Sequence, residues 1–205
     1  MSVRNLAMAA GALFVSLAVV PMSPLHAQAK VKNPKPNDLK ADSLQADTKF
    51  IHEASADNIL YVRSGRIAEG KATRPDVRKF GQRMVTDHSK LEDQLKSLAS
   101  SGGIKLDEGL GPRHEQKIDN LQKASRKEFD RAYMTTMVRQ HDDDVSYFAK
   151  EGREVHSAKL RELNADALTI LQQHLSSAKA IAEKVGADTA SAAHAVRTPK
   201  HKNRS

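Results

Sequence analysis

Residues 84–95, MVTDHSKLEDQL, carry the pattern that decides the fold of this chain. Apolar side chains recur every three or four residues, from Met84 to Leu91 and Leu95, as on the buried face of an amphipathic α-helix. Between Met84 and Leu91 this face carries His88 instead of an aliphatic side chain. Moving an imidazole into an apolar core costs free energy unless its nitrogens find partners. The position of His88 therefore raises the question of what its ring binds.

The same helical period continues on both sides of this stretch and predicts an all-α fold. We expect four long helices, over residues 48–71, 75–100, 127–151 and 157–185. The middle connection is long, and it holds a predicted short helix over residues 113–123. No strand pattern is present in the sequence. These features predict a four-helix bundle with a long crossover that contains a short extra helix.

The composition agrees with a helical bundle and excludes several kinds of chemistry. Aromatic residues make up 4% of the 205-residue chain, which is few for a β-sandwich but ordinary for a helical bundle. The chain has no cysteine, so disulfides, thiolate metal ligands and cysteine nucleophiles are excluded. A glycine-rich phosphate loop, a G-x-S-x-G motif and an H-E-x-x-H motif are also absent from the sequence. The sequence therefore gives no support to these chemistries, and whether the chain is an enzyme stays open, with a non-enzyme favoured.

The first 29 residues have the features of a secretory signal peptide. Arg4 precedes an apolar run over residues 6–20, which is shorter than the roughly 20 residues of a membrane-spanning helix. Small residues follow and offer cleavage after Ala27 or Ala29. We therefore expect residues 1–29 to be removed and the mature chain to be periplasmic or otherwise exported. Association with the outer membrane stays open, and no later run is apolar enough to span a membrane.

The segments beside the predicted bundle are basic and poor in apolar residues. Residues 30–47 predict a flexible basic linker, residues 187–205 predict a disordered basic tail, and the bundle domain spans residues 48–186. The chain has a formal net charge of +8, which suggests an anionic partner. Because export argues against nucleic acid, two alternatives remain for the tail. It contacts an anionic surface of the cell envelope, or it is solvated without a specific partner.

Two further predicted helices repeat the feature seen at His88. Residues 127–151 carry His141 on their apolar face, and residues 157–185 carry His174 on theirs. At about 1.5 Å rise per residue, the three histidines lie about 17–21 Å from helix ends that can share one side of a crossover bundle. We therefore expect the three imidazoles to occupy one layer of the core. The other histidines of the bundle are predicted on the surface or at helix ends: His52, His114 and His156.

Two interpretations of this layer are open. The imidazoles are either neutral core groups, which hydrogen-bond to neighbouring oxygens and fix helix register, or metal ligands. In the second case His88, His141 and His174 each give one nitrogen to the metal. Asp144 is then a fourth ligand or a hydrogen-bond acceptor behind the ligands. Asp87 lies on another part of its helix, where we expect it to contact an adjoining helix.

Three blocks of the sequence resemble a bacterial exported family, the domain of unknown function 4142. They are RPDVRKFGQRMVTDHSK at residues 74–90, EFDRAYMTTMVRQHDDDVSYF at residues 128–148 and LQQHLSSAKAI at residues 171–181. The resemblance covers about residues 50–185. It implies a ferritin-like four-helix bundle of the cell envelope, often labelled an outer membrane protein, without an established activity.

A ferritin-like fold raises the question of a di-iron centre. Such centres take a glutamate from each of two helices and a Glu-x-x-His motif from each of the other two. Here the residues three positions before the histidines are Val85, Val138 and Leu171, and Tyr61 stands where the family tends to carry a glutamate. A di-iron centre is therefore not expected, and a single transition metal such as zinc or copper suits the histidines better. The missing carboxylates favour a non-catalytic envelope or stress-related module over the metal-binding alternative.

Overall fold

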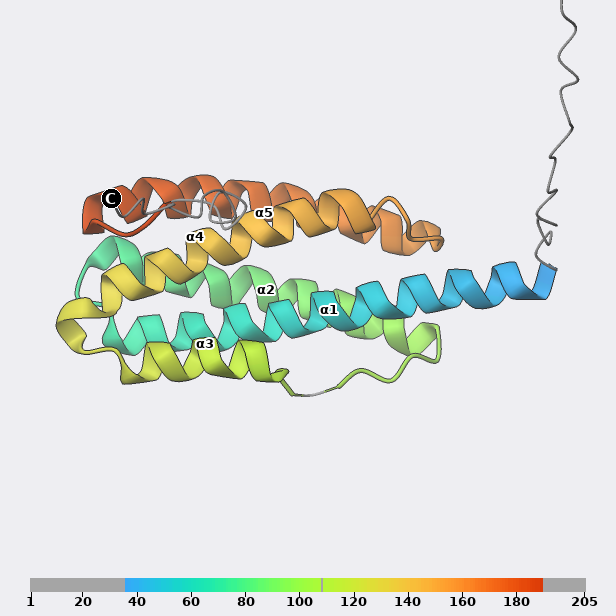
Figure 1. The fold of residues 1–205 in the computed structure, drawn as a ribbon, viewed down its shortest axis with the longest axis horizontal. Coiled ribbons are helices and arrows are strands. Elements are labelled where there is room, and N and C mark those ends of the chain that lie inside the picture. Colours follow the sequence, from blue (N-terminus) through green and yellow to red (C-terminus); the bar gives the residue numbers. More distant parts are fainter. Residues whose placement is uncertain (1–35, 108, 190–205) are drawn as a thin grey trace, which may run out of the picture. The chain divides into compact units, whose positions relative to one another are not determined.

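The computed structural model describes residues 36–107 and 109–189 of the chain. Their helices are α1 (Pro36–Lys71), α2 (Pro75–Ser101), α3 (Pro112–Lys123), α4 (Arg126–Glu151) and α5 (Ala158–Val185). The described ranges contain no strand. α1 packs mainly against α2 and α4 packs mainly against α5, while α3 runs along α1 within the crossover (Figure 1). The predicted all-α bundle with a long crossover and a short extra helix is confirmed.

The described residues include only part of the predicted linker and of the predicted tail. The predicted signal peptide lies outside the described residues, as does the predicted tail from residue 190 onward. Within the described ranges, no helix has the length and apolar character that crossing a membrane requires.

The first helix begins earlier than predicted. α1 starts at Pro36, so the prediction of a flexible linker over residues 30–47 is wrong for residues 36–47. Proline suits the first turn of a helix, and the polarity of the segment reflects exposure, since Leu44 is 57% exposed. The carboxylate of Asp47 accepts hydrogen bonds from the backbone N–H groups of His156, at 2.7 Å, and Ser157, at 2.9 Å. These two hydrogen bonds connect the first part of α1 to the residues that immediately precede α5.

The ends of α5 follow the local signals of the sequence. The Ser157 hydroxyl accepts a hydrogen bond from the backbone N–H of Leu160 at 3.4 Å, as an N-cap does. Gly186 follows the helix with φ 63°, a left-handed conformation that glycine adopts without a steric penalty. Both predicted helix limits are confirmed.

α1 and α2 approach each other closely at two glycines. A Cβ atom on Gly65 would lie 2.6 Å from the carbonyl oxygen of Gly81, and one on Gly81 would lie 2.9 Å from the carbonyl oxygen of Gly65. The two backbones can pack at this distance only because neither residue has a side chain. Tyr61 lies one turn before Gly65 on α1. Because the helices approach closely here, its ring stacks on the imidazole of His88, with ring centroids 4.0 Å apart.

We expect Gly65→Ala to lower the free energy of unfolding by about 1–3 kcal/mol, because the added methyl group would meet a backbone atom that cannot move freely. Gly70→Ala is the matched control on the same helix. A Cβ on the exposed Gly70 meets nothing within 4 Å, so we expect a gain of up to about 1 kcal/mol from helix propensity. Urea unfolding measures both variants. Equal effects at the two positions would contradict the close helix approach.

Candidate metal centre

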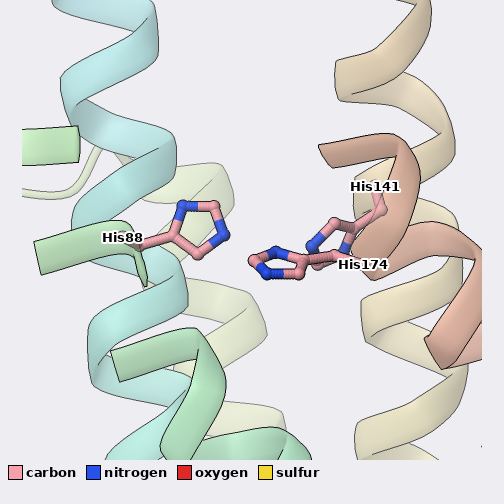
Figure 2. Close-up of side chains that lie close together, drawn as sticks. All are labelled: His88, His141 and His174. Atoms are coloured by element: carbon pink, nitrogen blue, oxygen red, sulfur yellow. The ribbon is translucent and has the colours of Figure 1, made fainter. Parts of the chain in front are cut away.

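The apolar faces of α2, α4 and α5 bring His88, His141 and His174 together in the core. Their exposed fractions are 1%, 0% and 0%. The ring centroids are 6.0 Å apart for His88 and His141, 5.3 Å for His88 and His174, and 5.5 Å for His141 and His174. Figure 2 shows the ring of His88 reaching toward the rings of the other two. The three predicted residues thus form one buried cluster, which we call the imidazole layer.

One nitrogen of each ring is hydrogen-bonded to an oxygen atom. Each partner is an acceptor, so each bond fixes the ring proton on that nitrogen. The donors and acceptors are Nδ1 of His88 to Oδ1 of Asn58 at 2.9 Å, Nδ1 of His141 to the carbonyl of Met137 at 2.8 Å, and Nε2 of His174 to Oδ2 of Asp87 at 2.8 Å. The last of these bonds confirms the prediction that Asp87 contacts an adjoining helix.

The second nitrogen of each ring has no hydrogen-bond partner among the residues that the structure describes. These atoms are Nε2 of His88, Nε2 of His141 and Nδ1 of His174. Because the opposite nitrogen carries the proton, each of these atoms presents a lone pair. One ring nitrogen of each histidine lies within 4.8 Å of one from each of the others. Three nitrogen donors therefore converge in one buried space.

Burial keeps the three imidazoles neutral. Loss of solvation lowers the pKa of His88 well below its ordinary value, and the neighbouring imidazoles of His141 and His174 lower it further. Loss of solvation, with the nearby His174, lowers the pKa of His141 to about 3. Burial also lowers the pKa of His174, although its hydrogen bond to Asp87 opposes the shift. At pH 7 the layer is therefore in the protonation state that binds a metal ion.

The spacing and the donor type fit one transition-metal ion. Imidazole nitrogens bind zinc at about 2.0–2.1 Å, which places neighbouring nitrogens about 3.4 Å apart. From a spacing of at most 4.8 Å, each nitrogen would have to move toward the common centre by about 0.8 Å or less. Rotation of the side chains supplies such a movement, and the oxygen acceptors behind the rings resemble the outer partners of metal-bound histidines.

Asp144 does not lie among the imidazoles. Its carboxylate accepts hydrogen bonds from the hydroxyl of Tyr61 at 2.6 Å and from Nε2 of Gln140 at 2.7 Å. In the described ranges, the group that can hold a metal contains the three histidines only. Tyr61 stacks on His88 and lies 4.4 Å, between ring centroids, from His141. The position of Asp144 is therefore that of an acceptor behind the layer, reached through Tyr61, and not that of a fourth ligand.

A buried polar cluster behind Tyr61 includes a histidine whose burial the sequence did not predict. Nε2 of Gln140 also donates to Oδ1 of Asp57 at 3.1 Å, and Nε2 of His114 lies 3.2 Å from the same oxygen. His114 is predicted on the surface or at a helix end; it lies in the first turn of α3, but it is only 5% exposed. The missed signal is its spacing, because Ile118 lies one turn further on the same buried face of α3. Burial and the neighbouring Asp57 raise the pKa of Asp144 well above its ordinary value.

Asp87→Ala is expected to weaken metal binding by about 10- to 100-fold, because Asp87 holds the proton of His174 on Nε2 and leaves Nδ1 free to bind. The carboxylate is 31% exposed, so water can replace it and the metal-free stability should change little. Metal titration with a chromophoric competitor measures the loss. Asp93→Ala, at an exposed position of the same helix, is the matched control. Equal metal affinities in the two variants would show that Asp87 does not contribute to metal binding.

Comparisons with known proteins agree with this fold. A family model described as "Domain of unknown function (DUF4142)" matches residues 32–181, which include all three histidines. A solved structure, "Crystal structure of DUF305 fragment from Deinococcus radiodurans", superposes with a TM-score of 0.61 and 11% sequence identity, and the match covers 68% of this chain and 96% of that one. At this identity the likeness shows the fold alone. No curated protein matches the chain.

Proposed function

We propose that this chain, which belongs to the family of domain of unknown function DUF4142, holds one transition-metal ion between His88, His141 and His174. One observation supports the proposal above all others. In each ring one nitrogen is bonded to an oxygen, whereas the other nitrogen has no partner in the described part of the chain. Metal-bound histidines show this division, with one nitrogen on the metal and the other held by an outer acceptor.

The competing function is a metal-free scaffold in which the histidines only fix the register of the helices. In that case three buried nitrogens remain without partners, and each costs about 1–3 kcal/mol of stability. A buried histidine that serves only as a core group is expected to satisfy both nitrogens. The grouping of one ring nitrogen from each of the three histidines within 4.8 Å of the other two favours the metal.

The proposed role of the ion is binding and not catalysis. The three rings are 0–1% exposed, so a substrate in solvent does not meet the ligands. His88 belongs to the pair formed by α1 and α2, whereas His141 and His174 belong to the pair formed by α4 and α5. An ion bound by all three would join the two helix pairs through the core.

Metal analysis of the purified chain tests the proposed function. The protein is prepared without a histidine tag, incubated with zinc, copper or iron salts, desalted and analysed by elemental mass spectrometry. We expect one ion per chain in the wild type and none in a variant with alanine at His88, His141 and His174. A control with alanine at His52 and His156, which lie outside the layer, should keep the ion. Absence of stoichiometric metal from the wild type would contradict the proposal.

We also propose that the bundle acts outside the cytoplasm, on the support of the signal-peptide features of residues 1–29. Protein recovered from a periplasmic fraction is expected to start at Gln28 or Lys30. N-terminal sequencing and intact mass measure this start. Recovery of the chain with Met1 still attached, in the cytoplasmic fraction, would contradict export.

A further inference from the structure

The proposed site has no anionic ligand. Among the described residues, the group of three or more side chains that could hold a metal ion consists of the three histidines, with ligand atoms within 4.8 Å of one another. The nearest carboxylates are engaged elsewhere, Asp87 on Nε2 of His174 and Asp144 on the hydroxyl of Tyr61. An ion in the layer would therefore keep its full charge in a buried space. The cost of desolvation rises with the square of the charge, so a divalent ion costs about four times as much to bury as a monovalent ion.

Aromatic rings border the layer. The ring of Tyr61 stacks on His88 and tilts toward His141. Phe80 is edge-on to His141 and His174, with ring centroids 6.2 Å and 6.3 Å apart. The hydroxyl of Tyr61 points to Asp144, so neither ring offers a donor atom to the layer. Aromatic faces also attract a cation through their ring quadrupoles.

A small cavity near the site does not supply a fourth ligand either. It has a volume of about 20 Å³, enough for a single water molecule, and His88, Asn58 and Tyr61 are among its lining residues. Neither His141 nor His174 lines it. Asn58, which accepts the proton of Nδ1 of His88, lines the same cavity. Water in the cavity would therefore contact only His88 of the three rings.

The site favours some metal ions over others because of three features. Its donors are three neutral nitrogens, it is buried, and it lacks a fourth ligand. Zinc is almost always bound by four ligands, and divalent copper and nickel favour square-planar or tetragonal sites. Monovalent copper is a closed-shell ion that accepts three ligands in a plane, and it carries half the charge. We infer that the imidazole layer selects copper in its cuprous state, bound by three histidines without a fourth ligand. This inference rests on the proposed function.

An anaerobic competition experiment on the untagged wild-type chain tests the inference. Cuprous copper is titrated against bathocuproine disulfonate, and zinc is titrated separately against a chromophoric zinc indicator. We expect one cuprous ion per chain, bound at least about 1,000-fold more tightly than zinc, with both affinities lost in the triple-alanine variant. Zinc binding as tight as copper at the same histidines would overturn the inference and leave the proposed function standing. Histidine-independent binding of both metals would overturn both.

Substitution of Tyr61 tests the cause of the selectivity. Tyr61→Glu places a carboxylate beside His88 and His141, and we expect it to narrow the ratio of copper to zinc affinity by at least about 10-fold. Tyr61→Phe keeps the aromatic ring and should leave the ratio unchanged. An unchanged ratio in a folded Tyr61→Glu protein would contradict the coordination argument. Should that variant not fold, the wild-type competition decides the inference alone.

Discussion

Replacing His141 with leucine is expected to stabilise the metal-free protein and to remove its response to metal. The ring is 0% exposed and its Nε2 atom has no partner among the described residues, so leucine would exchange an unsatisfied polar group for an apolar one of similar size. The backbone carbonyl of Met137 remains in the helix. We therefore expect the free energy of unfolding without metal to rise by about 1–2 kcal/mol.

The same substitution has the opposite effect when metal is present. A ligand that binds only the folded state at 1,000 times its Kd adds about 4 kcal/mol to the stability of the wild type. With one of three ligands gone, we expect the affinity to fall at least about 100-fold, which removes about 2.7 kcal/mol of that gain. Urea unfolding with and without metal measures both effects. His156→Leu, at an exposed histidine, is the control and should respond to metal as the wild type does.

The outcome of this comparison separates the two interpretations of the layer. If the histidines are only core groups, His141→Leu changes the metal-free stability and metal alters neither protein. If they are ligands, the variant is the more stable protein without metal and the less stable one with it. Equal stabilisation of both proteins by metal would contradict a site at His141.

Acid should destabilise the metal-free wild type more than the His141→Leu variant. In the folded state the pKa of His141 is about 3, against about 6.5 in an unfolded chain. The unfolded chain therefore binds the proton first, and the stability associated with the neutral ring is present above pH 6.5 and lost as the pH falls toward 3. Between pH 7 and pH 5 this difference amounts to about 2 kcal/mol.

The comparison of the two proteins isolates the imidazole. Burial raises the pKa values of Asp144 and Glu92, and groups of this kind act in the opposite sense, because their stabilisation is lost as the pH rises through the folded pKa. Both carboxyls are present in the wild type and in His141→Leu, so their contributions cancel in the difference. The measurement is the free energy of unfolding of each metal-free protein at pH 7, 6 and 5. Parallel pH dependences would contradict a neutral, buried His141.

The fold and the three histidines could be predicted because helical periodicity places residues on faces. Each of three helices carries one histidine on its apolar face at a matching depth, and antiparallel packing then brings them into one layer. The start of α1 was missed because residues 36–47 are polar, which is equally typical of an exposed helix and of a linker. His114 was missed because a face of only 12 residues gives few apolar positions to compare.

The sequence could not predict which nitrogen of each imidazole ring carries the proton. Which nitrogen carries the proton depends on the oxygen behind it, and the three oxygens come from a side-chain amide, a backbone carbonyl and a carboxylate. The position of Tyr61 between the layer and Asp144 is likewise a result of the glycine contact between α1 and α2. Because of these contacts, each of the three buried histidines offers one unprotonated nitrogen as a possible metal ligand.

Nitrogen-15 NMR of the histidine side chains tests the central claim most directly. In protein labelled with ¹⁵N-histidine, long-range ¹H–¹⁵N spectra report the state of each ring nitrogen, and the single His→Leu variants assign the signals. The metal-free protein is expected to show neutral rings protonated at Nδ1 of His88, Nδ1 of His141 and Nε2 of His174. Addition of one equivalent of metal should shift Nε2 of His88, Nε2 of His141 and Nδ1 of His174 to metal-bound values together. Spectra of the three rings that are unchanged by zinc and by cuprous copper would contradict the claim.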